Sequence, residues 1–312
     1  MSDSLPMPIS TLTRAQRSSI MNLVRRAART EIMPRFRRLD ASDIAQKTSR
    51  QDLVTEADHA SEAMIARGLV GLFPNALIVG EEDVAKNPEV RDRIADAELA
   101  FTIDPVDGTW NYAHGLSTFG VIISALRFGV PIFGLIYDPV MDDFVIGDSG
   151  GAAEMVVPKR RSTRALSVSA GGALADLQGY LPLYMLPKDK QGEMAALLPR
   201  FERVLSLRCS AHEMRMLAQG HVDFVLSAGL TPWDHAAGAL LCQCAGGHVA
   251  MLDGSDYNAA KREGYLLCAA NLETWERIRD AMSFLLDTPA ATAVTDDEPD
   301  EGPSEAPESG EG

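Results

Sequence analysis

The stretch from Phe101 to Asn111 constrains the fold of this chain more than any other. An apolar run ends at one aspartate, and a second aspartate follows three residues later, before Gly-Thr-Trp-Asn. In a continued strand Asp104 and Asp107 would point to opposite faces, because side chains alternate. Pro105 lacks an N–H group, which disfavours continuation of the strand. We therefore predict a turn that can bring both carboxylates to one side of a strand end.

Two carboxylates on one side of a strand end need a cation or a proton between them. At a separation of ~4 Å they repel by about 4 kcal/mol at an effective dielectric constant near 20. Hard oxygen ligands of this kind suit Mg²⁺, Ca²⁺ or Mn²⁺. Gly108 and Thr109 then offer backbone N–H groups and a hydroxyl where a helix could begin, a natural anion site. The stretch alone is equally compatible with an acidic surface turn, since Asp-Pro and Asp-Gly are ordinary turn dipeptides.

The composition is that of a globular protein whose charge is concentrated at one end. The 312 residues carry a net charge of −15, and the last 17 hold eight acidic residues and no Lys or Arg. This balance argues against nucleic acid as the main partner. No apolar run approaches the roughly 20 residues of a membrane span, and the N-terminus lacks a signal-peptide pattern. A cytoplasmic protein without membrane contact is predicted. The four cysteines fit neither a disulfide framework nor a zinc pattern.

The first half is predicted to combine two helices with antiparallel strands. Thr13 can cap an arginine-rich helix, whose charged face is expected to be solvated. Thr55 and Asp58 resemble a capping box that begins a second helix, and capping alone would explain both residues. Strands are expected at 77–79, 99–103, 121–128, 132–137 and 144–146, the last three as an antiparallel meander.

The second half alternates short apolar runs with helical segments, which predicts a mostly parallel or mixed sheet with flanking helices. The runs are 204–207, 222–226, 248–252 and 265–269, and the helical segments are 193–201, 211–219, 234–245 and 273–286. Asp234 is placed as the cap of one of these helices. From about Thr288 onward the composition predicts disorder.

Four acidic motifs occur in an order that is typical of a known family. They are Lys47 with Asp52–Asp58, Gly80–Glu82, Ile103–Asn111, and Trp233–Gly238 with Ala245–Gly247. Over residues 12–286 the chain resembles the inositol monophosphatase family of Mg²⁺-dependent phosphomonoesterases, within the sugar-phosphatase superfamily. Each motif is weak or moderate alone, whereas four in order at compatible spacing are specific.

The resemblance implies a layered α/β/α/β/α fold, an α+β or α/β arrangement, in a protein that is usually a homodimer. Residues 10–165 would form an N-terminal half with an antiparallel sheet that carries most metal ligands. Residues 166–290 would form a C-terminal half with a mixed sheet, which carries Asp234 and the substrate pocket. Residues 291–312 would be a disordered acidic tail.

The resemblance also implies the metal ligands. Glu81, Asp104 and the carbonyl oxygen of Val106 would hold a first Mg²⁺, while Asp104, Asp107 and Asp234 would hold a second, with Asp104 bridging. Two or three ions are expected in all, with inhibition by Li⁺. Paired metals suit phosphate monoesters, because they activate water and stabilise the leaving oxygen without a protein nucleophile.

Further roles are implied around these metals. Gly108 and Thr109 would bind phosphate through backbone N–H groups. Thr109, linked to Asp58, would help activate water together with Glu81, and Lys47 would lie on a mobile loop nearby.

One departure from the family concerns the substrate, a small-molecule phosphate ester. Ser227 stands where inositol-hydrolysing members have an acidic residue that contacts substrate hydroxyls, so specificity for inositol is in doubt. His212 and Glu213 are expected to shape a different leaving-group pocket, whereas His235 is expected to pack or to hydrogen bond. Other sugar or polyol phosphates, histidinol phosphate and phosphoadenosine phosphate all remain open. A regulatory binding protein that uses the arginine-rich helix or the acidic tail is the non-enzymatic alternative.

Overall fold

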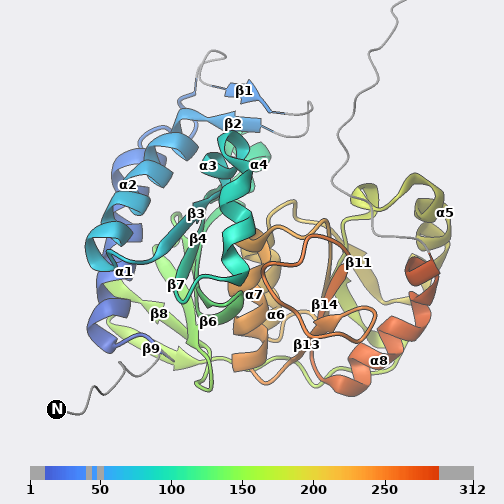
Figure 1. The fold of residues 1–312 in the computed structure, drawn as a ribbon. Helices are drawn as coiled ribbons and strands as arrows, with labels where there is room; N and C mark the ends of the chain where they lie inside the picture. The colour runs from blue at the N-terminus through green and yellow to red at the C-terminus, as the bar shows by residue number, and fades with distance from the viewer. Residues whose placement is uncertain (1–10, 40–43, 48–52, 288–312) are drawn as a thin grey trace, which may run out of the picture.

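The computed structural model describes residues 11–39, 44–47 and 53–287. They form five layers, as predicted (Figure 1). Helices α1 (Arg14–Ala27) and α2 (Glu56–Leu72) cover the outer face of a seven-stranded sheet. Helices α6 (Ser210–Ala218) and α7 (Pro232–Cys244) lie between this sheet and a five-stranded one. Helices α5 (Lys188–Leu197) and α8 (Leu272–Ala281) cover the far side of the smaller sheet.

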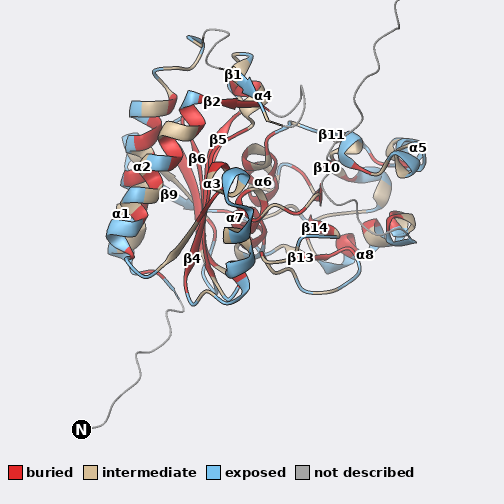
Figure 2. Ribbon diagram, turned by 45° about the horizontal axis from the view of Figure 1, so that its top comes forward, coloured by how far each residue is buried: buried red, intermediate tan, exposed pale blue. Residues whose placement is uncertain are grey.

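The seven-stranded sheet follows the chain from strand to neighbouring strand. Only β3 and β4 are parallel, and the other neighbours are antiparallel, so the predicted meander is confirmed. Its central strands are buried on both faces by the flanking helices (Figure 2). The strands are β3 (Leu77–Gly80), β4 (Ala100–Asp107), β5 (Gly120–Arg127), β6 (Val130–Asp138), β7 (Asp143–Asp148), β8 (Glu154–Val157) and β9 (Ser162–Ala165).

The expectation that Pro105 ends its strand is wrong. Strand β4 continues through Pro105 to Asp107. Asp104 is paired with Ile122 and Asp107 with Gly120, so β4 advances one residue more than β5 between these pairs. Such a bulge tolerates a proline, because the extra residue is not paired in the ladder. It also cancels the alternation of side chains, so that both aspartates can face the same way.

The five-stranded sheet is mixed, as predicted, with the strand order β11-β10-β12-β14-β13. Strand β10 is parallel to β11 and β12, whereas β14 is antiparallel to β12 and β13. Strand β10 was not predicted, because Gln-Gly-Tyr is short and lacks an apolar pattern. The strands are β10 (Gln178–Tyr180), β11 (Arg203–Leu205), β12 (Phe224–Ala228), β13 (His248–Met251) and β14 (Tyr265–Ala269).

Two of the three predicted helix caps are present. Thr13 forms a capping box with Gln16, and Thr55 forms one with Asp58. The first helix continues into a π-helical turn, Ala28–Ile32. The short elements are β1 (Ile44–Gln46), β2 (Leu53–Thr55), α3 (Glu81–Lys86), α4 (Thr109–Ala113) and 3₁₀ turns at Pro88–Ala95, Pro158–Arg160, Leu174–Asp176, Leu183–Met185, Leu198–Arg200 and Ser283–Asp287.

Two further predictions concern the acidic tail and the absence of membrane-spanning segments. The acidic tail lies outside the described residues, so its predicted disorder is not tested. Within the described ranges, no helix is both long enough and apolar enough to cross a membrane.

Candidate active site

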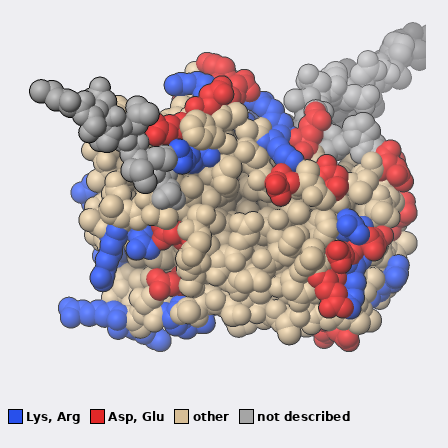
Figure 3. All heavy atoms as spheres, turned by 60° about the horizontal axis from the view of Figure 1, so that its bottom comes forward, with Lys and Arg blue, Asp and Glu red and all other residues tan. Residues whose placement is uncertain are grey.

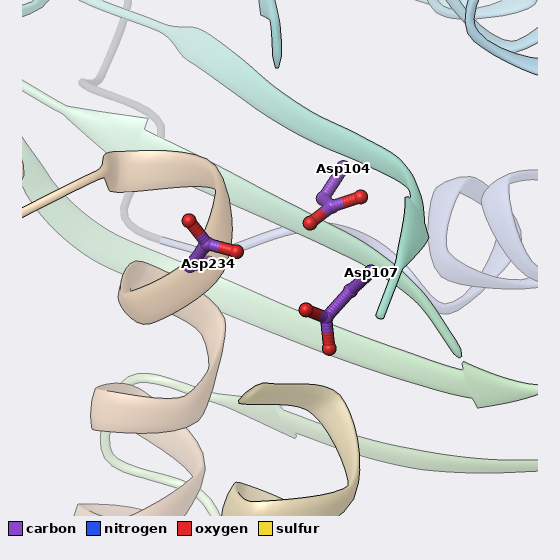
Figure 4. A group of neighbouring side chains, drawn as sticks. All are labelled: Asp104, Asp107 and Asp234. Atoms are coloured by element: carbon purple, nitrogen blue, oxygen red, sulfur yellow. The ribbon is translucent and has the colours of Figure 1, made fainter. Parts of the chain in front are cut away.

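Three aspartates from distant parts of the chain converge at one point. Asp104 and Asp107 come from the bulged end of β4, and Asp234 comes from the first turn of α7 (Figure 4). One carboxylate oxygen of each lies within 4.8 Å of the others. The bulge and the helix start thus bring together three of the four acids that the sequence singled out.

Asp234 is not the cap of its helix, which corrects the prediction. Thr231 is the N-cap and Pro232 is the first helical residue, which places Asp234 third. The Thr231 hydroxyl donates a hydrogen bond to the Asp234 carboxylate. This contact helps to orient Asp234 toward the two aspartates of β4.

Asp107 is held by the start of α6, a role that the sequence did not reveal. The backbone N–H of Ala211 donates to Asp107 Oδ2 at 2.5 Å, and the Cys209 thiol lies 3.0 Å from the same atom. Asp104 is held locally, since its Oδ1 accepts the N–H of Val106 at 3.1 Å. Both side chains are therefore fixed before any ligand binds.

The charges at this point oppose one another. Burial raises the pKa of Asp107 to about 7, with a further contribution from the charge of Asp234. Burial, followed by the charges of Glu81 and Asp107, raises the pKa of Asp104 well above its usual range. Buried carboxylates that repel one another are stabilised when a divalent cation binds between them. The donor set therefore fits a hard divalent metal ion.

Glu81 stands at the start of α3, beside the three aspartates but outside their closest group. Its Oε1 lies 2.7 Å from Lys47 Nζ, which also lies 2.6 Å from Glu82 Oε1. Burial raises the pKa of Glu81 to about 8, although Lys47 acts in the opposite direction. The predicted proximity of Lys47 to the acidic site is thus present, in the form of an ion pair with Glu81 and Glu82.

Glu62 holds the start of the helix that carries Glu81, and its role was not predicted from the sequence. Its carboxylate accepts the N–H of Glu82 at 2.8 Å and that of Asp83 at 3.0 Å. A Cβ at Gly80 would lie 2.3 Å from the Glu62 carboxyl carbon, so a larger residue there would displace the Glu62 carboxylate. Burial raises the pKa of Glu62 to about 7, while the two N–H groups act to lower it. The glycine before the acidic run was the one available signal.

The turn after Asp107 has the conformation that its sequence demands. Gly108 has φ +83°, and a Cβ there would lie 2.9 Å from the carbonyl oxygen of Thr118. The Thr109 hydroxyl lies 3.2 Å from Asp58 Oδ1 and 2.9 Å from the Val106 carbonyl oxygen. The predicted link between Thr109 and Asp58 is therefore present. Burial raises the pKa of Asp58 to about 6 against the opposing hydrogen bond from Thr55.

Two of the residues expected in the substrate pocket, His212 and Glu213, lie on α6, whose start holds Asp107. His212 Nε2 lies 3.1 Å from the Phe119 carbonyl oxygen, and buried Glu213 accepts the N–H of Leu207 at 2.7 Å. Ser227 is buried on β12, opposite Leu266. Contact of these side chains with a substrate stays a prediction. His235 accepts the N–H of Thr231 at 3.2 Å, the hydrogen-bonding role expected for it.

The five-layered fold and the carboxylate cluster between its sheets define a class, that of layered α/β proteins with an acidic metal-type centre. The family model described as "Inositol monophosphatase family" matches residues 14–283. The chain therefore belongs to the inositol monophosphatase family.

Several relatives are 28–32% identical to this chain over about two thirds of its length. An inositol-1-monophosphatase of Mesorhizobium japonicum is 31% identical over 207 residues, 65% of this chain and 73% of that protein. A fructose-1,6-bisphosphatase/inositol-1-monophosphatase of Thermotoga maritima is 28% identical over 217 residues, 69% and 78% of the two chains. A Pseudomonas aeruginosa protein named Nus factor SuhB is 32% identical over 215 residues, 66% and 74%.

Solved structures agree with this assignment. A Thermotoga maritima IMPase superposes with a TM-score of 0.71 at 22% identity, covering 88% of this chain and 98% of that one, which supports the fold alone. An inositol monophosphatase from Anabaena superposes with a TM-score of 0.59 at 30% identity, covering 74% and 85%.

Proposed function

We propose that this protein is a Mg²⁺-dependent phosphomonoesterase that hydrolyses a small polyol, sugar or amino-alcohol phosphate. The observation that carries the proposal is the convergence of Asp104, Asp107 and Asp234, with Glu81 beside them. Phosphate-monoester hydrolysis is among the slowest uncatalysed reactions, so its catalysts need strong electrostatic stabilisation. A cluster of hard anionic ligands would bind the divalent cations that provide this stabilisation.

The proposed metal ligands form two sets that share Asp104. Glu81, Asp104 and the Val106 carbonyl would hold one ion, and Asp104, Asp107 and Asp234 a second. Bound Mg²⁺ would supply charge neutralisation and an acidified water. Lys47 would have to release Glu81 when a metal ion binds, because the Lys47 ammonium group and the metal ion would bind the same carboxylate.

The protein's own groups orient the reactants. Thr109, hydrogen bonded to Asp58 and to the Val106 carbonyl, is positioned to hold a water or to pass its proton toward Asp58. Asp58 is buried, and its pKa of about 6 suits a group that accepts a proton near neutral pH. Gly108 and Thr109 would bind the phosphate oxygens.

A phosphate-release assay tests this proposal. Purified protein is offered inositol, histidinol, sugar and nucleotide phosphates with Mg²⁺, then with Li⁺ added. We expect Mg²⁺-dependent turnover of at least one ester, inhibition by Li⁺, and a loss of about 100-fold or more in Asp107→Asn. Asp280→Asn changes an exposed carboxylate on α8 and should keep full activity. Full turnover by Asp107→Asn would overturn the assignment.

The names of some relatives favour a second candidate, a regulatory role on the same fold. Relatives in Pseudomonas aeruginosa and Xylella fastidiosa are named Nus factor SuhB. These names give no support to the expectation that nucleic acid is not a partner, so that expectation depends only on the acidic net charge of the chain. Deleting residues 291–312 and comparing co-purifying proteins tests this role. Unchanged partners together with robust catalysis would contradict it.

Self-association belongs to the same proposal. We expect a homodimer, as the family resemblance implies. Figure 3 shows a face with a broad central area that carries few charged side chains, which suits packing against another protein surface. Light scattering on the purified chain gives the mass that decides this point.

A further inference from the structure

A stack of cation and aromatic rings stands beside the acidic centre. The guanidinium carbon of Arg208 lies 4.1 Å from the centroid of the Trp110 ring, and the His114 ring stacks on Trp110 at 4.1 Å. Burial lowers the pKa of Arg208, and no neighbouring carboxylate raises it. Within the described residues the Arg208 charge is thus held on an aromatic face and is not neutralised by an ion pair.

The loop that carries Arg208 is held by hydrogen bonds with three side chains, two of which are buried. Glu213 accepts the N–H of Leu207 at 2.7 Å, and the Asn111 amide donates to the Leu207 carbonyl at 2.9 Å. Ser206 Oγ accepts the N–H of Arg208 at 3.2 Å. Arg208 itself has φ +54°, a conformation that non-glycine residues rarely adopt. Three side chains thus hold the backbone in a conformation that presents Arg208.

Both members of the pair are attached to the acidic centre. Trp110 follows Asp107 by three residues, and Arg208 precedes Cys209, whose thiol lies 3.0 Å from Asp107 Oδ2. A Cβ at Gly108 would lie 3.3 Å from the Arg208 carbonyl oxygen, so the two turns are in contact. The Arg208 charge therefore belongs to the rim of the same site.

We propose that Arg208, supported by Trp110, is a specificity-determining residue that binds a second anionic group on the substrate, such as a second phosphate. Arginine binds phosphate oxygens through a planar fork of N–H donors, and an aromatic face leaves its edge available for them. The inference rests on the proposed function and deepens it, since it favours esters with a second anionic group over monophosphates of uncharged polyols.

Two esters that differ only in the second phosphate test this inference. We compare kcat/KM for fructose 1,6-bisphosphate and fructose 1-phosphate in the wild type, Arg208→Gln and Arg208→Lys. The matched control is Arg277→Gln, an exposed arginine on α8. The wild type should prefer the bisphosphate, and Arg208→Gln should lower that preference about tenfold with little change for the monophosphate. Arg208→Lys should fall between, and Arg277→Gln should match the wild type.

Binding gives a second measurement that does not depend on turnover. Fructose 1,6-bisphosphate should change the tryptophan fluorescence of the wild type, with Trp110→Phe as the blank, and Arg208→Gln should weaken that binding about tenfold. Equal preference and equal affinity in wild type and Arg208→Gln would overturn the inference. No turnover of any ester in the phosphate-release assay, together with Arg208-dependent binding, would instead overturn the proposed function and retain the anion-binding role.

Discussion

At the scale of single residues, Glu62 shows how a side chain outside the acidic centre can determine its geometry. Its two oxygens accept the N–H groups of Glu82 and Asp83, in the first turn of the helix α3 that begins with Glu81. A helix start leaves such donors without partners inside the helix, so a buried carboxylate there replaces a cap. The position of Glu81 therefore depends on a residue outside the proposed set of metal ligands.

We predict that Glu62→Ala lowers the free energy of unfolding by about 1–3 kcal/mol, because two buried N–H groups lose their acceptor. It should also raise the Mg²⁺ concentration needed for half-maximal activity, since Glu81 loses its fixed position. Urea unfolding and Mg²⁺ titration of activity measure the two effects. Glu276→Ala, an exposed change on α8, serves as the control. A variant as stable and as Mg²⁺-sensitive as the wild type would contradict this role.

The sequence revealed some of these residues and concealed others for a physical reason. Asp104, Asp107 and Asp234 stand out in the sequence because they follow an apolar run or precede a helical one, with turn residues beside them. Glu62 lies on a helix face, where a glutamate is ordinary, and Cys209 resembles any buried thiol. Their importance comes from the partners that tertiary structure brings to them, and spacing along the chain does not encode those partners.

At the scale of elements, the arginine-rich first helix is attached to the large sheet through charge. Arg25 on α1 forms a two-pronged pair with Asp142, with both nitrogen–oxygen distances at 2.6 Å. Tyr137 also donates to Asp142 at 2.8 Å. The expected solvated face is therefore wrong for Arg25, because its partner lies 117 positions away in the turn between β6 and β7.

Removing one side of this pair should be costly. We predict that Arg25→Gln lowers the free energy of unfolding by about 3 kcal/mol, because it leaves Asp142 buried with weaker partners. Arg26→Gln on the exposed side of α1 is the matched control. Chemical denaturation of both variants measures the difference, and equal stabilities would show that α1 is held by its apolar face alone.

The pH dependence of the same pair has a definite sign. The hydrogen bond from Arg25 holds the pKa of Asp142 well below its usual range. The native state therefore binds fewer protons than the unfolded chain once the pH falls toward the ordinary aspartate pKa. The contribution of this pair should be complete above about pH 5 and should decline as the solution is acidified below it. Arg25→Gln should lose that part of the acid sensitivity.

At the scale of the whole molecule, the order of the layers was predictable and the order of the small sheet was not. Residue patterns indicated an antiparallel half followed by a mixed half, and the resemblance supplied the sequence of layers. Strand β10 lies between two parallel neighbours, β11 and β12. This position depends on Gly179, which lets the Phe224 ring approach closely. That contact joins elements far apart in the chain, so no local sequence pattern predicts it.

The acidic centre itself links layers, and this leads to a prediction for the stability of the entire protein. Asp104 and Asp107 belong to the seven-stranded sheet, Asp234 belongs to the middle helix layer, and α6 anchors Asp107. A cation that binds all three carboxylates binds only the folded chain. At a Mg²⁺ concentration 100 times its Kd, linkage adds about 2.7 kcal/mol to the free energy of unfolding.

Thermal unfolding in EDTA and in Mg²⁺ measures this increment. The wild type should unfold at a higher temperature with Mg²⁺, and Asp234→Asn should lose most of the rise. Without metal, Asp234→Asn should be at least as stable as the wild type, because it removes one of three repelling charges while an amide oxygen can still accept from Thr231. Asp280→Asn should keep the full increment. An equal rise in all three proteins would place the stabilising Mg²⁺ away from these aspartates and would remove the physical basis of the proposed catalytic centre.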